Sequence, residues 1–527
     1  MRAALSALVV LAAGGLAGCG GGSSSGGSAP AASTGTGTAT VVDAGTGTGP
    51  TGIVGSAASL SARCAAPRSG IDPNTGITYL DQPGTVGDEK NWVRAWIDET
   101  YLWYDEVPTN LAAASYATPV AYFNVLKTPQ LTASGRAKDR FHFVYDTAVY
   151  NGINASVESG YGMQFAFVAR SAPRNIRVAY TEPGSPAASA GIARGARVLA
   201  IDGVDAVNAT STADLATLNA GLAPSTNGQA HRFTLQAVDG STNSFTLTSS
   251  SIARSPVQNV RSIDTASGRV GYLQFNDHVD KAEAQLIAAV NQLKTAGIAD
   301  LVLDLRYNGG GKLAIASELA YMVAPASATT GTTFERIATN AKNPFNFTAA
   351  QAALPFYSRT RGYSTTSGQP LPQLGLSRVT VLAGPDTCSA SESIVNGLRG
   401  VGVAVNLIGG TTCGKPYGFY PQDNCSTTYF AIQTQGVNAR GFGDYGDGFA
   451  PTCTVADDFQ HALGDAAEAR LAAALTYRTT GACPVPAAAL AARSSGTPAA
   501  AAESPETPYL DSPVPRTSRL LEPAAPR

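Results

Sequence analysis

The sequence predicts a multidomain α/β protein. Its 527 residues exceed what one hydrophobic core usually organises, so two or three domains are expected. Between residues 268 and 477, apolar strand patterns alternate with helix patterns, as in domains whose helices cover a sheet. Both ends of the chain are instead rich in small residues, which indicates folded domains between two flexible ends.

The first residues have the features of an export signal. Arg2 precedes an apolar run that is short for a membrane span and ends in small residues before Cys19. The sequence Leu-Ala-Gly-Cys at this point resembles the lipobox of bacterial lipoproteins. That resemblance implies a signal peptide over residues 1–19, lipidation at Cys19, and a lipid anchor on the periplasmic side of the inner or outer membrane. An ordinary signal peptide cleaved nearby is the alternative.

Composition argues against several classes of ligand. Lys+Arg number 36 against Asp+Glu 38, so the chain lacks the basic footprint of nucleic-acid binding. Beyond Cys19 the chain has an even number of cysteines, which in an exported protein predicts disulfides, although six cysteines allow 15 pairings. A zinc site is the weaker alternative, because no CxxC pair is present and the histidines are scattered. We therefore expect no metal and no cofactor.

The N-terminal part is predicted to be a flexible linker followed by a helical domain. Residues 20–61 are Gly, Ser, Thr and Ala with few large apolar side chains, so they form the linker. Residues 62–150 form the helical domain, because Trp92, Trp96 and neighbouring aromatic residues recur near a period of 3.6. That pattern starts near residue 88 and ends at Pro108, and a second helix is expected over residues 119–126.

Residues 159–251 are predicted to form a small β-rich domain. GYGMQFAFV, at residues 160–168, is a glycine loop followed by a strand, and PGSPAASAGIARGARVLAIDGVDA follows at residues 183–206. The second stretch indicates a turn, a short helix over 185–190 and a strand over 197–201, and it resembles PDZ domains of exported proteases. The resemblance implies that Gly160, Tyr161, Gly162 and Met163 bind the carboxylate of a peptide C-terminus. A glycine turn in an unrelated β domain is the alternative.

The last folded domain is predicted over residues 268–483, followed by an Ala/Pro-rich tail over 484–527. Its expected elements are strands over 270–275, 301–305 and 379–383, and helices over 280–296, 312–323, 465–475 and from about residue 390.

Three short motifs in this domain carry the chemical signal. In DLRYNGGGKL, residues 304–313, a buried strand leads into glycines whose N–H groups suit an anion or oxyanion, while the nucleotide pattern GxxxxGK[ST] is absent. In GPDTCSASESIVNGLRG, Ser389 lies at a strand-to-helix turn, where Ala390 offers an oxyanion donor; an N-cap serine is the alternative. In LIGGTTCGKPYGF, Lys415 follows an apolar strand, and a desolvated lysine can act as a base; a solvated surface lysine is the alternative.

The motifs, in this order after the PDZ-like module, resemble the tail-specific or C-terminal processing peptidases, the S41 family of serine peptidases. The resemblance implies a catalytic domain related to the crotonase and ClpP folds, with Ser389 as nucleophile and Lys415 as general base. It also implies an oxyanion hole formed by Ala390 with Gly310 or Gly311, of which we favour Gly310. Polypeptides captured by their C-terminal tails would be the substrates.

Two departures from the family pattern concern the lysine motif. Family members often carry a glutamine four residues after the lysine, where this chain has Phe419, and Gln422 lies three residues further on. Cysteines also flank both catalytic motifs, which suggests Cys388–Cys413 and Cys425–Cys453 as disulfides. A Ser/His/Asp triad is disfavoured, because His278 is better explained as a helix-start residue. A non-catalytic periplasmic PDZ scaffold and an acyl-CoA enzyme of crotonase-like fold are the alternative functions.

Overall fold

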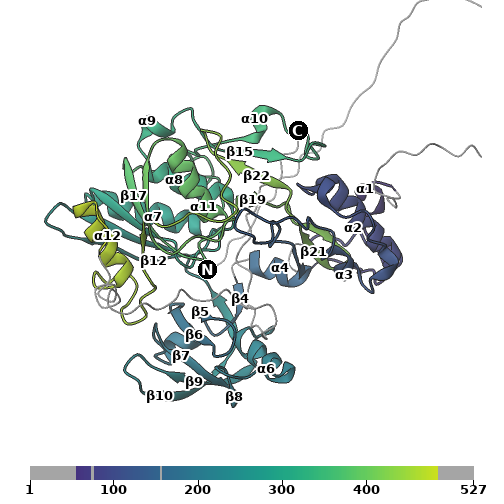
Figure 1. Cartoon of the computed structure of the whole chain (residues 1–527), viewed down its shortest axis with the longest axis horizontal. Coiled ribbons are helices and arrows are strands. Elements are labelled where there is room, and N and C mark those ends of the chain that lie inside the picture. The colour runs from purple at the N-terminus through teal and green to yellow at the C-terminus, as the bar shows by residue number, and fades with distance from the viewer. Residues whose placement is uncertain (1–54, 73–75, 155–156, 485–527) are drawn as a thin grey trace, which may run out of the picture. The chain divides into compact units, whose positions relative to one another are not determined.

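The computed structural model describes residues 55–72, 76–154 and 157–484 (Figure 1). The predicted signal peptide with Cys19, most of the predicted linker and residues 485–527 of the predicted tail lie outside this part. Among the helices described, none combines the length and the apolar character that crossing a bilayer requires.

Helices are the longest regular elements of the N-terminal segment. Its elements are α1 Ala57–Leu60, β1 Arg63–Cys64, β2 Gln82–Pro83, α2 Val86–Thr100, the 3-10 turns Tyr104–Glu106 and Ala113–Ser115, α3 Pro119–Phe123, β3 Phe143–Asp146 and α4 Thr147–Asn154. Thr85 caps α2 in a capping box with Asp88, which fixes where the helix begins. Trp92 and Trp96 stack at 5.5 Å on its buried face, so the predicted aromatic core is present.

One contact joins this segment to the end of the predicted linker, and another joins it to the C-terminal domain. The linker predicted over residues 20–61 ends earlier, because Ala57 and Leu60 are buried and the Ala57 N–H donates to Glu99 Oε1 at 2.8 Å. Strand β3 pairs antiparallel with β21 Thr427–Phe430, which belongs to the C-terminal domain. The predicted helical domain therefore shares a sheet with the domain that carries the catalytic motifs.

The PDZ-like module has its own core. Its elements are β4 Val157–Gly160, β5 Met163–Ala169, β6 Asn175–Thr181, α5 Pro186–Ser189, β7 Arg197–Ile201, β8 Val204–Asp205, α6 Thr212–Leu222, β9 Ala230–Gln236, β10 Thr242–Thr248 and β11 Ser250–Ala253. The sheet order is β10-β9-β7-β6-β5, and β4 pairs with β11 where the chain enters and leaves the module. Strand β5 is consequently at an edge of the described sheet.

The C-terminal domain is built on a six-stranded sheet. Its elements are β12 Val257–Ile263, β13 Val270–Phe275, α7 Ala282–Thr295, β14 Asp300–Asp304, α8 Leu313–Val323, α9 Ala326–Thr329, β15 Thr333–Thr339, α10 Ala349–Ala352, β16 Ala353–Pro355, β17 Arg378–Ala383, α11 Ala390–Gly400, β18 Ala404–Gly409, β19 Tyr417–Gly418, β20 Gln422–Asn424, β21, β22 Thr434–Val437, β23 Cys453–Thr454 and α12 Ala469–Thr480. The order is β12-β13-β14-β17-β18-β23, and all neighbours after the first pair are parallel.

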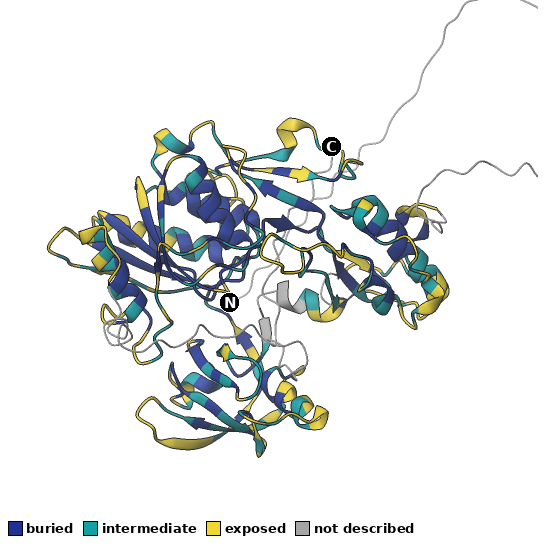
Figure 2. Cartoon of the chain, viewed as in Figure 1, coloured by how far each residue is buried: buried dark blue, intermediate teal, exposed yellow. Residues whose placement is uncertain are grey.

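Side chains alternate between the two faces of this sheet, as the two-residue period of a strand requires. In β14, Leu301 and Leu303 face a core shared with α7, α8 and α11, whereas Val302 faces a core shared with α12. Because both faces are covered, the central strands are buried throughout, which Figure 2 shows in dark blue. The predicted α/β architecture is confirmed.

The largest differences from the predicted elements lie at the two ends of this domain. The sheet starts before residue 268, since β12 belongs to it; a bulge at Asn259 and wide exposure hide this strand in the sequence pattern. Helix α12 begins later than predicted, because Glu468 caps it, and it runs on to Gly481, whose left-handed conformation ends it.

Three disulfides are present among the described residues. Cys388–Cys413 was predicted and is confirmed. Cys425–Cys453 is wrong: the structure pairs Cys64 with Cys425 and Cys453 with Cys483. The Ala62 N–H donates to Asn424 Oδ1 at 2.8 Å, which places Cys64 beside Cys425, a contact that no local pattern indicates.

Candidate active site

Ser389 occupies the turn between β17 and α11 in a strained conformation. Its φ of 60° and ψ of −115° are rare for a residue other than glycine. Such strain is typical of a nucleophile held on a sharp strand-to-helix turn. The side chain is fully buried, and its Oγ has no hydrogen-bond partner among the described residues. The hydroxyl is therefore free to interact with a base or a substrate.

Glu392, in the first turn of α11, connects this serine to the lysine motif. Its Oε2 accepts the backbone N–H of Ser389 at 2.9 Å and that of Lys415 at 2.8 Å. Its Oε1 accepts the N–H of Gly414 at 2.9 Å and the hydroxyl of Thr412 at 2.5 Å. One carboxylate thus fixes the backbone of both predicted catalytic residues.

The disulfide Cys388–Cys413 is a second connection between the same two loops. It joins the residue before Ser389 to the loop before Lys415. The Cys413 N–H also donates to the Thr387 carbonyl at 3.1 Å. Both sulfurs lie near the Glu392 carboxylate, but they are bonded to each other and so do not offer thiolates to a metal.

Lys415 is fully buried, and its Nζ has no hydrogen-bond partner among the described residues. Two aromatic rings surround the amine, with Nζ 3.9 Å from the ring centroid of Phe419 and 5.0 Å from that of Phe141. Burial holds the pKa of the amine well below its usual range, and only part of this effect is offset by the charges of Asp139 and Glu392. Burial thus favours the neutral amine, the form that a general base requires.

The glycine loop after β14 packs directly against the serine turn. Gly310 has a φ of 103°, and a Cβ at this position would lie 2.9 Å from both Ala390 N and Ser389 Cβ, so only glycine fits. Ala390 is the first residue of α11, and its N–H has no partner within the helix. The Gly310 N–H, however, donates to Asn308 Oδ1 at 3.0 Å. In this conformation the Gly310 amide is therefore not open to an oxyanion, contrary to the expectation from the motif.

His278 lies beneath this loop. The prediction that it starts a helix is wrong, because α7 begins at Ala282. Its Nδ1 is 3.0 Å from Asn308 Oδ1, and Asn308 Nδ2 donates to the Phe275 carbonyl at 2.9 Å. Burial lowers the pKa of His278 to about 3, so the ring is neutral and donates its Nδ1–H to Asn308. His278 thus supports the residue that holds Gly310.

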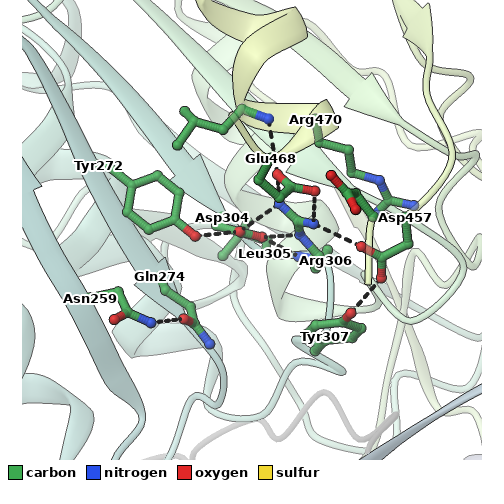
Figure 3. Close-up of polar contacts among 12 residues, drawn as sticks. Asn259, Tyr272, Gln274, Asp304, Leu305, Arg306, Tyr307, Asp457, Glu468 and Arg470 are labelled. Atoms are coloured by element: carbon green, nitrogen blue, oxygen red, sulfur yellow. Dashed lines mark hydrogen bonds and ion pairs between the residues drawn. The ribbon is translucent and has the colours of Figure 1, made fainter. Parts of the chain in front are cut away.

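A buried ion-pair network anchors the start of the glycine loop (Figure 3). Arg306 donates to Glu468 at 2.7 and 2.9 Å, to Asp304 at 3.0 Å and to Asp457 at 2.8 Å. The Tyr307 hydroxyl donates to the same Asp457. Because Arg306 and Tyr307 directly precede Asn308, these contacts fix the backbone at the start of the glycine loop.

This network extends to the PDZ-like module through one side chain. Arg194, in the loop before β7, donates to Asp457 at 2.8 Å and to the Tyr307 hydroxyl at 2.7 Å. It also donates to the Asp458 carbonyl at 2.9 Å. The module and the glycine loop therefore share ion-pair partners.

The four predicted peptide-binding residues lie together before the edge strand β5. Gly160 ends β4 and pairs with Ser250, and Met163 is the first residue of β5. Tyr161 is buried, with its ring 5.2 Å from that of Phe233. A Cβ on Gly162, whose φ is 76°, would lie 2.2 Å from Ser185 Cβ.

The sequence reasoning missed Glu392 and Asn308. The pattern Ser-x-x-Glu at 389–392 is that of a capping box and could have indicated Glu392. Asn308, inside the DLRYNGGG motif, is a polar residue next to glycines, a signal for a loop that is held by a side chain.

Family models match the three folded parts of the chain. They are described as the peptidase S41 N-terminal domain at residues 88–143, the PDZ domain at 177–225 and peptidase family S41 at 269–439. The chain is therefore similar to S41 peptidases in its N-terminal segment and in its C-terminal domain, with a PDZ domain between them.

Two curated relatives carry the description carboxyl-terminal-processing protease. The protein of Picosynechococcus sp. is 31% identical over 44% of this chain and 49% of its own length. The protein of Synechocystis sp. is 33% identical over 27% of this chain and 33% of its own length. The chain thus matches half or less of these relatives. A crystal structure from Bacteroides fragilis, described as an S41 protease, has a TM-score of 0.57 at 23% identity. It covers 74% of this chain and 97% of its own, which shows a common fold.

Proposed function

We propose that the protein is a serine endopeptidase that cleaves polypeptides with Ser389 as nucleophile and Lys415 as general base. One observation carries the proposal: Glu392 Oε2 binds the backbone N–H groups of both residues, while Ser389 Oγ and Lys415 Nζ are both buried without hydrogen-bond partners among the described residues. The two reactive groups lie on the loops that this carboxylate connects, and neither is hydrogen-bonded to another described residue.

The proposed reaction is a two-step acyl transfer. Neutral Lys415 accepts the hydroxyl proton of Ser389 as Oγ attacks the peptide carbonyl carbon, and the Ala390 N–H holds the oxyanion. The C–N bond then breaks, and the Lys415 ammonium returns its proton to the leaving amine. Water, deprotonated by Lys415, attacks the ester; the bond between the acyl carbon and Ser389 Oγ then breaks as the Lys415 ammonium returns this proton to Oγ, which releases the acid and restores both residues. The Gly310 N–H can be the second oxyanion donor once it leaves Asn308.

Incubation of the protein with unfolded polypeptides, followed by mass spectrometry of the products, tests this function. We expect fragments with the wild type and none with Ser389→Ala, and a serine-directed covalent probe should label the wild type at Ser389 only. If the folded wild type bound polypeptide tails but cleaved nothing and took no label, the protein would be the non-catalytic PDZ scaffold instead.

Capture of C-terminal tails by the PDZ-like module is the second part of the proposal. An extended peptide can add to the edge strand β5, with its carboxylate at residues 160–163. A side chain at position 162 would clash with Ser185, because its Cβ would lie 2.2 Å from Ser185 Cβ, so Gly162→Val should distort the loop. We expect this variant to cleave long substrates with apolar tails more weakly. Cleavage of short reporter peptides should change little. Equal loss on both substrates would show that the module organises the active site instead.

We also propose that Cys19 is lipidated and holds the protein at the periplasmic side of the cell envelope. The support is the Leu-Ala-Gly-Cys sequence alone. Cys19→Ser should move the protein from the membrane fraction to the soluble fraction. A variant that stays in the membrane fraction would overturn the anchor.

A further inference from the structure

The amine of Lys415 is held in an unusual way for a buried cation. Buried polar groups in proteins normally have hydrogen-bond partners, yet this Nζ has none among the described residues. The contacts around it are instead the faces of two rings, at 3.9 Å for Phe419 and 5.0 Å for Phe141. Both distances are within the range in which a ring face attracts a cation.

We propose that Phe419 and Phe141 form an aromatic clamp that positions the Lys415 amine and stabilises its protonated form. The inference rests on the proposed function, in which Lys415 must hold a proton between two chemical steps. Phe419 and Phe141 are positioning residues in this account. They act through Lys415 and have no assigned contact with the substrate.

The clamp is rigid because other aromatic residues fix its main ring. Phe419 is fully buried, and it packs edge to face with Phe143 at 5.7 Å and with Phe430 at 5.8 Å. Edge-to-face pairs of this kind are attractive and set the ring plane. On the other side, the Phe141 N–H donates to Asp139 Oδ1 at 3.0 Å. Each ring face is therefore held toward the amine from a different part of the chain.

The nearby carboxylates that could replace the clamp as hydrogen-bond acceptors are already occupied. The carboxylates of Asp139 and Glu392 are the charged groups that act on the amine. Asp139 accepts the Tyr101 hydroxyl at 2.6 Å and lies 3.3 Å from His142 Nδ1, while Glu392 binds four donors at the two loops. Gln422, the nearest glutamine after the lysine motif, is exposed and contacts the Asp423 carbonyl instead.

A ring face suits this role for a physical reason. It attracts the ammonium ion but not the neutral amine, so it favours the state that exists after proton transfer from Ser389. It also accepts no specific N–H bond, which leaves the ammonium hydrogens free to return a proton to the leaving amine. The clamp therefore opposes the effect of burial on the pKa without blocking the reaction.

Fluorination of Phe419 tests the clamp, because it weakens the negative face of the ring while it almost preserves its shape. Phe419 is replaced by 3,4,5-trifluorophenylalanine, and the matched control carries the same residue at Phe356, which is buried in the sheet core and packs on Phe334. The titration of Lys415 is followed by NMR of 13C-labelled lysine in a Ser389→Ala background, with the signal assigned by Lys415→Arg.

We expect the Lys415 titration of the protein fluorinated at position 419 to move to lower pH by about half a pH unit or more. The protein fluorinated at position 356 should titrate like the parent, and Phe419→Leu should shift in the same direction as the fluorinated ring. An unchanged Lys415 titration midpoint in the protein fluorinated at position 419 would overturn the clamp. So would an equal shift of that midpoint in the protein fluorinated at position 356. A shift in the protein fluorinated at position 419, together with a folded wild type that cleaves no polypeptide, would support the clamp and refute the proposed function.

Discussion

Replacement of Glu392 by glutamine should disable the site while it leaves the fold nearly intact. The carboxylate accepts four donors, at 2.5 to 2.9 Å, from Ser389, Thr412, Gly414 and Lys415. An amide offers one acceptor and one donor, so in either orientation at least one backbone N–H faces an NH2 group. Hydrogen bonds to a charged group contribute about 1.5–3 kcal/mol each, and a buried unpaired donor costs about 1–3 kcal/mol. We therefore expect a loss of about 3 kcal/mol or more.

The loss falls on the alignment of the two loops, so it should appear mainly in catalysis. About 3 kcal/mol corresponds to roughly a hundredfold fall in kcat/KM. The assay is kcat/KM on an unfolded polypeptide, with urea unfolding to confirm the fold. The matched control is Glu318→Gln, another buried glutamate, in which burial and the nearby Glu283 raise the pKa to about 8. Because Glu318 is protonated at pH 7, the control should keep near-normal activity. Activity of Glu392→Gln within threefold of the wild type would refute the reasoning.

Three further predictions concern neighbouring features. Cys388→Ser with Cys413→Ser opens a loop of 25 residues and should lower the free energy of unfolding by about 3 kcal/mol, measured by urea denaturation; an unchanged midpoint would contradict the disulfide. Gly310→Ala should abolish turnover, because its Cβ would lie 2.9 Å from Ser389 Cβ. The control Gly297→Ala also replaces a glycine of positive φ, 65° against 103° at Gly310, but has open space at its Cβ and should keep activity. Retained activity in Gly310→Ala would show that the loop can move away. The raised pKa of Glu318 means that the native state binds this proton more tightly than the unfolded state between about pH 4.5 and 8. The free energy of unfolding of the wild type should therefore fall, relative to Glu318→Gln, as pH rises through this window. Parallel stability profiles of the two proteins would contradict a protonated Glu318.

The sequence was sufficient to predict the α/β core and the place where the motifs meet. Strands β14, β17 and β18 are short and largely apolar on both faces. This pattern is typical of a sheet whose two faces are both covered by helices. Each is followed by one of the three motifs, and the strands are parallel neighbours. Their carboxyl ends therefore share one edge of the sheet, where the three motifs lie. The pairing of Ser389 with Lys415 as a dyad came from the resemblance to the S41 family and stays a prediction.

Contacts between distant parts of the chain could not be predicted in this way. Phe141 reaches Lys415 from the N-terminal segment, and Cys64 reaches Cys425 from the same segment, because β3 joins the sheet of β21. No local period encodes such pairings. Gly310 illustrates a different limit, since its motif predicted a free amide, whereas the conformation gives that amide to Asn308. A motif indicates which groups can bind an oxyanion, but not their state in the free protein.

The most direct test of the central claim is kcat/KM for Ser389→Ala, Lys415→Ala, Lys415→Arg and the double alanine variant, measured as a function of pH on one unfolded substrate. A buried lysine with a lowered pKa becomes neutral as pH rises, so wild-type activity should rise through that pKa and reach a plateau. All four variants should lose turnover to a similar extent, because the two residues act as one unit and a guanidinium stays protonated. Near-normal activity of folded Lys415→Arg would contradict Lys415 as the base.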